Sequence, residues 1–550
     1  MKKVLLVGVN ARYTHSCLAL YCLKSYTRGV GADIIIREYT INRSAEEIAD
    51  EIAAEQPDAV ALSVYIWNTA LAQTMLPDLK KRLPECVFIL GGPEVSYNPE
   101  SWLADFPSID YVIPGQGEAA FRRLVESGFR HDEKIIRLPA PPFADMPPPY
   151  DERDLDALAN RYVYYESSRG CPYRCSYCLS SRADQKPESK SVDTVRNELI
   201  HILARGPKLV KFVDRTFNLD RERYRAIWRF LIEEYRDCST TFHFEVHPAR
   251  LDEDDFALLS RCPKGLFQLE IGVQSLNRDT LAAVRRSGEP EQFLPAISRL
   301  IRLGTIHVHL DLIAGLPFDG MESIGRAFNS LYALGPDHLQ LGFLKVLPGT
   351  EMRERADEFG IAYAERATYQ VCSTRWLAAD EMRLLQRIAH LIDRLYNSGR
   401  FPITLSALAA RYESPFDLYR DLAAETALPS SRRWEAGAEF LLGSAVSRFP
   451  DKKSFFLDAL RWDWCAGMKT TRCPSVIRPA NTAEIEKTGL RYFRDLAHDG
   501  TVRYREHVFT ISDLDRAVFF RAETEEFAAK NMDGYRHAVF IPSREVILFD

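Results

Sequence analysis

The sequence predicts an α/β protein with an N-terminal doubly wound, Rossmann-like domain, a central partial (β/α)6 TIM-like barrel and a mostly helical C-terminal extension. Three observations support this prediction. Short apolar runs alternate with amphipathic helical stretches through residues 1–137, the alternation resumes at residue 161, and it fades from residue 363. Strands that alternate with helices indicate parallel sheets covered by helices.

Five apolar runs in residues 1–137 predict the strands of the first domain, at 4–9, 33–37, 59–65, 87–90 and 111–113. Helices are expected at 45–54 and 69–83. This number of strands fits a flavodoxin-like, doubly wound sheet. Residues 138–160 are interpreted as a linker, because six prolines between Leu138 and Tyr150 exclude a helix or a central strand there.

A second series, over residues 161–362, predicts six strands at 162–167, 208–213, 241–246, 266–273, 305–313 and 338–346. Helices at 192–204, 221–235, 293–303 and 323–334 separate them. Six such units predict a partial barrel whose ligands lie at the carboxyl ends of the strands. Residues 363–550 form an uncharacterised C-terminal domain, with helices expected at 380–395, 415–426 and 431–447 and strand-like runs at 502–509 and 538–549.

The composition is that of an ordinary globular protein, with 46% hydrophobic and 27% charged residues and a net charge of −6. A protein held mainly by nucleic-acid phosphates is expected to be basic, so there is no strong nucleic-acid signal. No apolar stretch of about 18 residues suggests a membrane span. Eleven cysteines in 550 residues are too sparse for a disulfide scaffold, so we expect a reduced, cytoplasmic protein.

Three cysteines, Cys171, Cys175 and Cys178, follow the first strand of the second series at the spacing C-x3-C-x2-C. The alternatives are three buried thiols, a structural zinc site and an iron–sulfur cluster. Zinc prefers four protein ligands and no fourth is close in sequence, whereas soft thiolates also suit iron–sulfur clusters. Three thiolates on a four-iron cluster would leave one iron open to a small chelating ligand.

This motif, with the aromatic Tyr177 before its last cysteine, resembles that of the radical S-adenosylmethionine (radical SAM) superfamily. The resemblance implies a 4Fe-4S cluster held by the three cysteines and SAM chelated to the open iron. It further implies reductive cleavage of SAM to methionine and a 5′-deoxyadenosyl radical. A low-potential electron donor such as flavodoxin or ferredoxin would supply the electron.

Strand ends of the second series supply further candidates. The segment from Leu269 to Ser275 resembles the family's E-I-G-x-Q-S element, and alternation places Glu270 and Gln274 on one inward face, where unpaired polar groups are costly. A ligand would satisfy them; a private hydrogen bond within the protein is the alternative. Ile313 belongs to a strand that resembles the element lying against adenine. The SAM-binding candidates are Tyr177, Asp214, Glu245, Glu270, Gln274, Ser275 and Ile313.

Glycines at the strand ends of the first domain, in Gly91-Gly92-Pro93-Glu94 and Gly115-Gln116-Gly117-Glu118, complete a resemblance to cobalamin-binding (class B) radical SAM enzymes. The D-x-H-x-x-G motif, whose histidine ligates cobalt, is absent, which implies His-off cobalamin. His15 is better explained by a hydrogen bond to the corrin edge or by a helix-capping role than by axial ligation. The cobalamin-binding candidates are Asn10, Arg12, Thr14, His15, Ser63, Tyr65, Trp67, Gly91, Gly92, Glu94, Gly115, Gly117 and Glu118.

The resemblance implies a cobalamin-dependent C-methyltransferase that acts on an unactivated carbon. Radical rearrangement or oxidation without methyl transfer is the alternative within the same architecture. A non-catalytic cobalamin or iron–sulfur sensor or binding protein is the alternative of another class. No motif identifies the substrate, the catalytic residues, the environment below cobalt, the oligomeric state or the role of the C-terminal domain.

Overall fold

The computed structural model describes residues 2–181, 186–429, 431–467, 474–478, 487–488, 502–505, 508–511, 515–540 and 546–549. The chain divides into two compact units. The first comprises 1–327, 334–336 and 342–382, and the second comprises 328–333, 337–341 and 383–550. Among the described residues, no helix is both long enough and apolar enough to cross a membrane.

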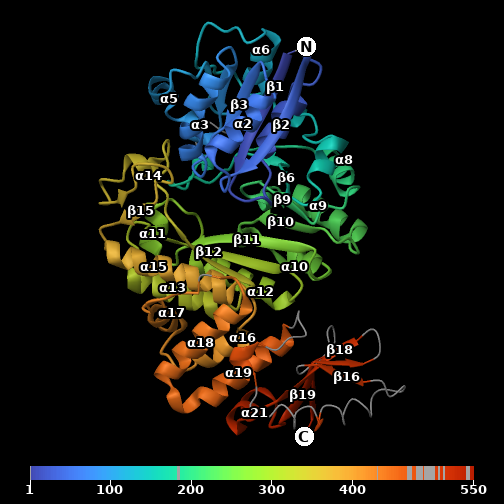
Figure 1. Ribbon diagram of the computed structural model, residues 1–550, viewed down its shortest axis with the longest axis vertical. Coiled ribbons are helices and arrows are strands. Elements are labelled where there is room, and N and C mark those ends of the chain that lie inside the picture. The colour runs from blue at the N-terminus through green and yellow to red at the C-terminus, as the bar shows by residue number, and fades with distance from the viewer. Residues whose placement is uncertain are drawn as a thin grey trace. The chain divides into compact units, whose positions relative to one another are not determined.

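The N-terminal sheet is parallel, with strand order β2-β1-β3-β4-β5 (Figure 1). Its strands are β1 (Lys2–Asn10), β2 (Ala32–Thr40), β3 (Ala59–Ser63), β4 (Val87–Gly91) and β5 (Tyr111–Ile113). Its helices are α1 (Leu18–Tyr26), α2 (Ala45–Ala54), α3 (Thr69–Arg82), α4 (Pro93–Ser96), α5 (Pro99–Asp105) and α6 (Glu118–Glu126). This order confirms the doubly wound prediction and puts the topological switch point, the usual ligand site of such sheets, between β1 and β3.

The sheet is apolar on both faces, which explains the nearly continuous hydrophobic run of β1. Leu5 and Val7 belong to one buried cluster, and Val4 and Leu6 belong to another. All four side chains are fully buried. A strand covered by helices on both sides has no polar face, so the apolar run locates β1 reliably from the sequence.

The central sheet confirms the partial barrel, with strand order β13-β12-β11-β10-β9-β6. Its strands are β6 (Val163–Tyr165), β9 (Leu209–Phe212), β10 (Thr241–Glu245), β11 (Phe267–Gln274), β12 (His307–Ala314) and β13 (His338–Phe343). The accompanying helices are α8 (Val192–Leu203), α9 (Arg221–Glu234), α10 (Glu253–Leu259), α11 (Arg278–Ala283), α12 (Pro290–Leu303) and α13 (Met321–Leu334).

The two faces of this sheet differ in character. Along β11, Phe267, Leu269, Ile271 and Val273 are buried, whereas the residues between them are only partly buried. The inner face carries polar side chains, among them Lys211, His243 and Glu270. Parallel sheets normally bury apolar residues on both faces, so a polar inner face indicates a surface that meets ligands or water.

Short elements connect and extend the two sheets. The two-residue strands β7 (Ser168–Arg169) and β8 (Glu188–Ser189) pair with each other near the cysteines, and α14 (Glu351–Glu354), β14 (Ala362–Tyr363) and β15 (Val371–Ser373) follow the barrel. The proline-rich stretch is followed by the helix α7 (Glu152–Ala157), which begins at a capping box made by Asp151 and Asp154.

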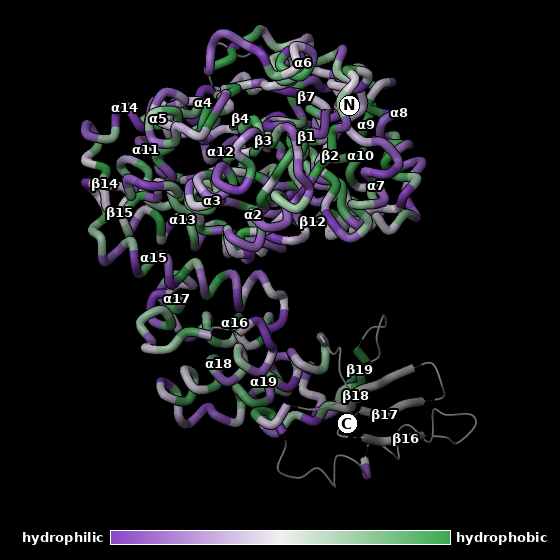
Figure 2. The backbone as a smooth tube through the Cα atoms, turned by 45° about the horizontal axis from the view of Figure 1, so that its top comes forward, coloured by the Kyte–Doolittle hydropathy of each residue, from purple (hydrophilic) through white to green (hydrophobic). Residues whose placement is uncertain are grey.

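The second unit contains the helices α16 (Pro402–Ala409), α17 (Pro415–Ala423), α18 (Trp434–Arg448), α19 (Lys453–Ala466) and α21 (Glu525–Asn531), and α15 (Ala379–Leu391) leads into it. An antiparallel sheet is formed by β16 (Val502–Arg505), β17 (Val508–Ile511), β18 (Asp515–Arg521), β19 (His537–Phe540) and β20 (Ile547–Phe549). Hydrophilic and hydrophobic residues alternate along α18 and α19 (Figure 2). The helices confirm the predicted helical extension.

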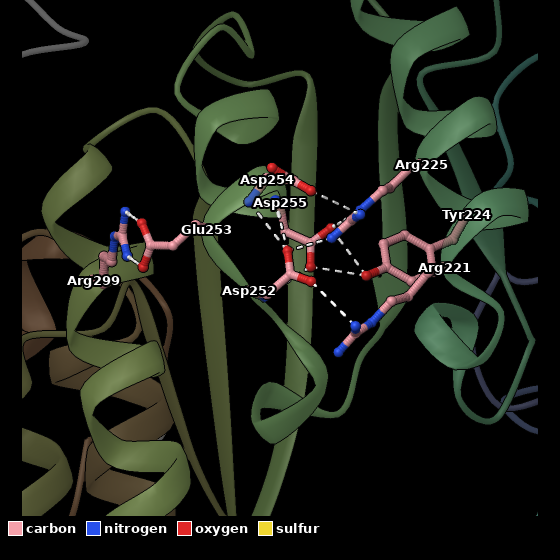
Figure 3. A network of polar contacts seen from close by, with 8 residues as sticks. All are labelled: Arg221, Tyr224, Arg225, Asp252, Glu253, Asp254, Asp255 and Arg299. Carbon is pink, nitrogen blue, oxygen red and sulfur yellow. Dashed lines mark hydrogen bonds and ion pairs between the residues drawn. The ribbon is translucent and has the colours of Figure 1, made fainter.

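On the outer side of the barrel, a network of ion pairs joins α9 to α10 (Figure 3). The fully buried Asp255 accepts hydrogen bonds from the Tyr224 hydroxyl over 2.8 Å and from Arg225 Nε over 2.7 Å. Arg225 also pairs with Asp252 and, over 3.3 Å, with Asp254. The charged cluster is thus centred on a buried carboxylate with several donors.

We expect Asp255→Ala to lower the melting temperature, because the Tyr224 hydroxyl and Arg225 Nε would lose their buried acceptor. Each unsatisfied donor costs about 1–3 kcal/mol. The matched control is Asp254→Ala, because the Asp254 side chain is 82% exposed and touches the same arginine. Thermal unfolding followed by circular dichroism compares the two. Equal melting temperatures for both variants would contradict the assignment.

Candidate functional site

The three cysteines lie on one loop, between β7 and a 3-10 turn at Leu179–Ser181. The backbone N–H of Cys178 donates to the carbonyl of Cys175 over 3.0 Å, and Cys171 Sγ lies 3.7 Å from Thr216 Oγ1. Burial, together with the neighbouring thiols of Cys178 and Cys175, raises the pKa of Cys171. The three cysteines therefore share one loop at the carboxyl end of the barrel, and Cys175 and Cys178 lie near enough to Cys171 to affect its ionisation.

Within the described ranges, no three His, Cys, Asp or Glu side chains are arranged to hold a single metal ion. In a four-iron cluster each thiolate binds a different iron, so the sulfur atoms lie farther apart than around one ion. Three thiols on one loop fit such a cluster.

Two further loops of the barrel hold the cysteine loop in place. Ser176 N donates to the carbonyl of Val284 over 3.0 Å, and Met352 N donates to the carbonyl of Ser176 over 2.8 Å. The Arg286 guanidinium lies 3.8 Å from Cys175 Sγ and also donates to the carbonyl of Gly272. Arg286 was missed by the sequence analysis because it lies in a loop without a motif.

The end of β11 fits a ligand that donates hydrogen bonds. Gln274 has a φ of +70°, and its side chain folds over Gly272, where an added Cβ would lie 2.2 Å from Gln274 Nε2. Only glycine leaves room for this arrangement. Gln274 Oε1 is buried and, in the described structure, accepts no hydrogen bond. An unsatisfied buried acceptor is costly, so a bound donor group would stabilise this residue.

Glu270 has partners within the chain, in agreement with the alternative of a private hydrogen bond. Its carboxylate lies 2.9 Å from His243 Nε2 and 3.3 Å from Lys211 Nζ. Burial opposes its ionisation, but the hydrogen bond from His243 and the charge of Lys211 hold the pKa of Glu270 well below its usual range. This residue supports the polar inner face of the barrel.

Asp214 and Ser275 also turn into the protein. Asp214 is fully buried and accepts hydrogen bonds from the Ser167 hydroxyl over 2.6 Å and from Ser167 N over 3.0 Å. Ser275 is 1% exposed and accepts from Asn277 N over 3.0 Å. The structure therefore does not bring these two SAM-binding candidates to a ligand-facing surface; Asp214 braces the segment that precedes the cysteines.

Three further SAM-binding candidates lie close to the predicted place. Tyr177 is beside Cys175 and Arg286, and Ile313 is partly exposed near the carboxyl end of β12. Glu245 ends β10, and its carboxylate lies 4.0 Å from the guanidinium of Arg215. Burial raises the pKa of Glu245 to about 7.

At the carboxyl edge of the N-terminal sheet, Trp67 and two glycines offer an accessible surface. Trp67 is 41% exposed, and its ring stacks on Tyr65 with centroids 4.4 Å apart. Gly92 has a φ of +102°, and an added Cβ would lie 2.5 Å from the carbonyl oxygen of Val64, while an added Cβ at Gly115 would meet open space. An exposed aromatic face beside backbone without side chains fits a large flat ligand such as a corrin.

Several other cobalamin-binding candidates bond to the protein itself. Asn10 Nδ2 donates to Glu38 over 2.9 Å, Ser63 Oγ lies 3.8 Å from Cys17 Sγ, and Glu94 is buried and accepts from the Tyr369 hydroxyl. Of the sheet-edge candidates, Arg12 and Gly115 are exposed, whereas Thr14, Gly91 and Gly117 are half-buried.

His15 contacts the barrel. Its Nδ1 lies 2.6 Å from the hydroxyl of Tyr164 on β6, and its ring also packs against Tyr162. Burial, reinforced by the charge of Arg12, lowers the pKa of His15. The loop after β1 thereby joins the first sheet to the second.

Arg169 joins the two candidate cofactor loops. It lies two residues before Cys171, and its guanidinium is 2.9 Å from Gln116 Oε1, 3.0 Å from Glu118 Oε1 and 2.8 Å from Glu166 Oε2. The same group lies over the ring of Phe143, 4.8 Å from its centroid. Glu118 thus faces Arg169, and the G-Q-G-E loop of the first domain is tied to the strand that leads into the cysteines.

We expect Arg169→Ala to cost about 3–5 kcal/mol, the usual effect of breaking a buried ion pair. Burial already raises the pKa of Glu166, and the variant removes the cation that opposes this shift. In the folded variant Glu166 would bind a proton that it does not bind in the unfolded chain. The loss of unfolding free energy relative to the wild type should therefore grow as the pH rises from 6 to 8. Denaturant unfolding at both pH values measures it. A deficit independent of pH, or shared by the exposed Arg153→Ala, would refute this role.

Glu245 gives a second pH-dependent expectation. Because its folded pKa lies above the usual value for glutamate, the wild type should lose stability as the pH rises from 5 to 8, by about 1–3 kcal/mol after allowance for partial exposure. Glu245→Gln should remove this slope and be relatively more stable at pH 8. Melting curves at both pH values test it, with the exposed Glu100→Gln as the control. Parallel profiles for wild type and Glu245→Gln would contradict it.

Family models match most of the chain in three segments. Residues 4–125 match a model described as B12 binding domain, and residues 165–331 match one described as Radical SAM superfamily. Residues 357–548 match a model described as Protein of unknown function (DUF4080). The first two segments coincide with the two parallel sheets, and the third begins after the barrel.

Individual proteins give the same picture. The chain is 24% identical over 405 residues to the cobalamin-dependent radical SAM methyltransferase TokK of Streptomyces tokunonensis. The aligned region covers 67% of this chain and 59% of TokK. It is 26% identical over 334 residues to the uncharacterized methyltransferase PH0819 of Pyrococcus horikoshii, covering 56% of this chain and 72% of PH0819. This chain thus spans less than two thirds of TokK.

Among solved structures, the radical SAM methyltransferase TsrM of Kitasatospora setae, with cobalamin and a [4Fe-4S] cluster bound, superposes with a TM-score of 0.57 at 17% identity. The match covers 84% of this chain and all but 1% of TsrM. This likeness concerns the fold. It confirms the expected architecture, and the two family models by themselves support the expected cofactors, a 4Fe-4S cluster, SAM and cobalamin. The chain thus contains a B12 binding domain and a domain of the radical SAM superfamily.

Proposed function

We propose that this protein is a cobalamin-dependent radical SAM methyltransferase that methylates an unactivated carbon of its substrate. The observation that carries the proposal is that Arg169 connects the carboxyl edge of the N-terminal sheet with the carboxyl edge of the barrel sheet. The thiols of Cys171, Cys175 and Cys178 lie at the carboxyl end of the barrel, and Arg169 ties their loop to the loop that follows β5 at the carboxyl edge of the N-terminal sheet. The name of TokK supports methyl transfer as the reaction.

The residues at the two edges fit the three cofactors. The three cysteines would hold the cluster, and Gln274 would accept a hydrogen bond from SAM, with Glu245, Tyr177 and Ile313 beside it. Trp67, Arg12 and the glycines at 92 and 115 would lie against cobalamin. When bound, the cluster and SAM supply a hydrogen-abstracting radical, and cobalamin supplies the methyl group.

The chain itself positions these groups. Arg286 holds the loop of Cys175 against the end of β11, and Tyr173 stacks on His247 with ring centroids 4.9 Å apart, closing the side of the loop next to β10. The paired charges of Lys211, His243 and Glu270 keep the inner face polar without leaving an isolated charge. We propose a low-potential donor such as flavodoxin or ferredoxin as partner, and a cytoplasmic location, where thiols stay reduced.

The test uses anaerobically reconstituted protein with hydroxocobalamin, a reductant and SAM deuterated in its methyl group. We expect the label to reach cobalamin, and 5′-deoxyadenosine to form when a cell extract supplies substrate. A variant with all three cysteines replaced by alanine should retain no iron and form no 5′-deoxyadenosine. Mass spectrometry measures both products.

The alternatives give other results. An intact cluster that yields 5′-deoxyadenosine while no label reaches cobalamin or any extract component would replace methyl transfer by radical rearrangement or oxidation. Bound cofactors without either product would favour a sensor or binding protein.

A further inference from the structure

A polar pocket opens beside two of the three cluster cysteines. It has a volume of about 520 Å³, and its lining includes Cys175 and Cys178 but not Cys171. Cys171 instead points toward Thr216, beyond β9. The pocket therefore marks the side of the cysteine loop from which solvent, or a partner, comes nearest to the candidate cluster.

Three arginines and two glutamates line this pocket. Arg285 lies 2.8 Å from Glu351 and is 56% exposed, and Arg355 lies 3.3 Å from the same glutamate. Arg355 is also bound by both carboxylate oxygens of Glu358, over 2.7 and 2.8 Å, so Arg285 remains the more accessible of the two guanidinium groups. Arg285 lies just after α11, Glu351 begins α14 and Arg355 follows it; α11 and α14 are drawn on the same side of the barrel in Figure 1.

Arg174 adds a charge directly at the motif. It is exposed, it precedes Cys175, and within the described part of the chain it pairs with no carboxylate. The rim therefore carries three positive and two negative groups, whereas the whole chain has a net charge of −6. A partner with an acidic surface would find its favourable charges here in the accessible Arg174 and Arg285.

We propose that this arginine rim, formed by Arg174, Arg285 and Arg355, is the docking surface for an acidic one-electron donor protein that carries a reduced flavin or iron–sulfur centre. The proposal rests on the proposed function, since it requires the cluster. In the step concerned, the donor's centre loses one electron and the cluster gains it, and no bond is formed or broken. Complexes of this kind are small and transient, so a short charged rim suffices.

The experiment measures reduction of the cluster rather than product formation. Full-length reconstituted protein is mixed anaerobically with reduced flavodoxin or reduced ferredoxin, and bleaching of the cluster's visible absorption is followed by stopped flow. Arg174→Glu and Arg285→Gln should each slow this reduction, and the double variant should be about tenfold slower, with a weaker dependence on salt.

Two controls make the result specific. Arg261→Glu changes the charge of a side chain that is 58% exposed and does not line this pocket, and it should reduce at the wild-type rate. Dithionite, a small reductant that needs no docking surface, should reduce all variants equally, which also shows that their clusters are intact.

The outcomes separate the two proposals. A cluster that dithionite reduces, but whose reduction by both donor proteins is unchanged in the double variant or equally slowed in Arg261→Glu, would overturn the docking surface alone. Protein that never acquires an iron–sulfur chromophore would overturn the proposed function, and the docking surface with it.

Discussion

The guanidinium of Arg169 is the interaction on which the site depends. Each parallel sheet places its own loops at its carboxyl edge. Neither sheet alone holds its carboxyl edge next to that of the other, which a reaction using both sets of loops requires. Arg169 sits in the strand that leads to Cys171, and it binds Gln116 and Glu118 from the other sheet. Because Glu166 shares the same guanidinium, the bridge contains one cation, the buried Glu118 and the half-buried Glu166, and the removal of the cation disturbs both loops together.

Polar residues whose hydrogen bonds are satisfied within the protein have a supporting role, whereas those with an unsatisfied group can bind a ligand. Asp214 follows β9 and Glu270 lies within β11, yet the oxygens of Asp214 are occupied by serine hydroxyls and those of Glu270 by His243 and Lys211. Gln274 stands at a similar position with an acceptor that no described donor satisfies. Polar residues at similar positions therefore have different roles, which follow from whether their hydrogen-bonding groups already have partners within the protein.

The sequence was sufficient for those features that depend on local pattern. Strands buried on both faces appear as apolar runs, and the cysteine loop appears as a spacing, so both sheets and the motif were predicted close to their observed places. Contacts between distant residues were not predictable in this way: Arg169 meets Gln116 across 53 positions, and Arg286 meets Cys175 across 111. Neither arginine belongs to a pattern, because its role is defined only by what the fold brings near it.

The most direct test of the account is the electron paramagnetic resonance spectrum of the anaerobically reconstituted, dithionite-reduced protein, recorded with and without SAM. The account predicts the signal of a reduced four-iron cluster, and a change in its g-values when SAM binds to the iron that no cysteine occupies. A protein that holds zinc at the loop, or a cluster whose signal is indifferent to SAM, would contradict it.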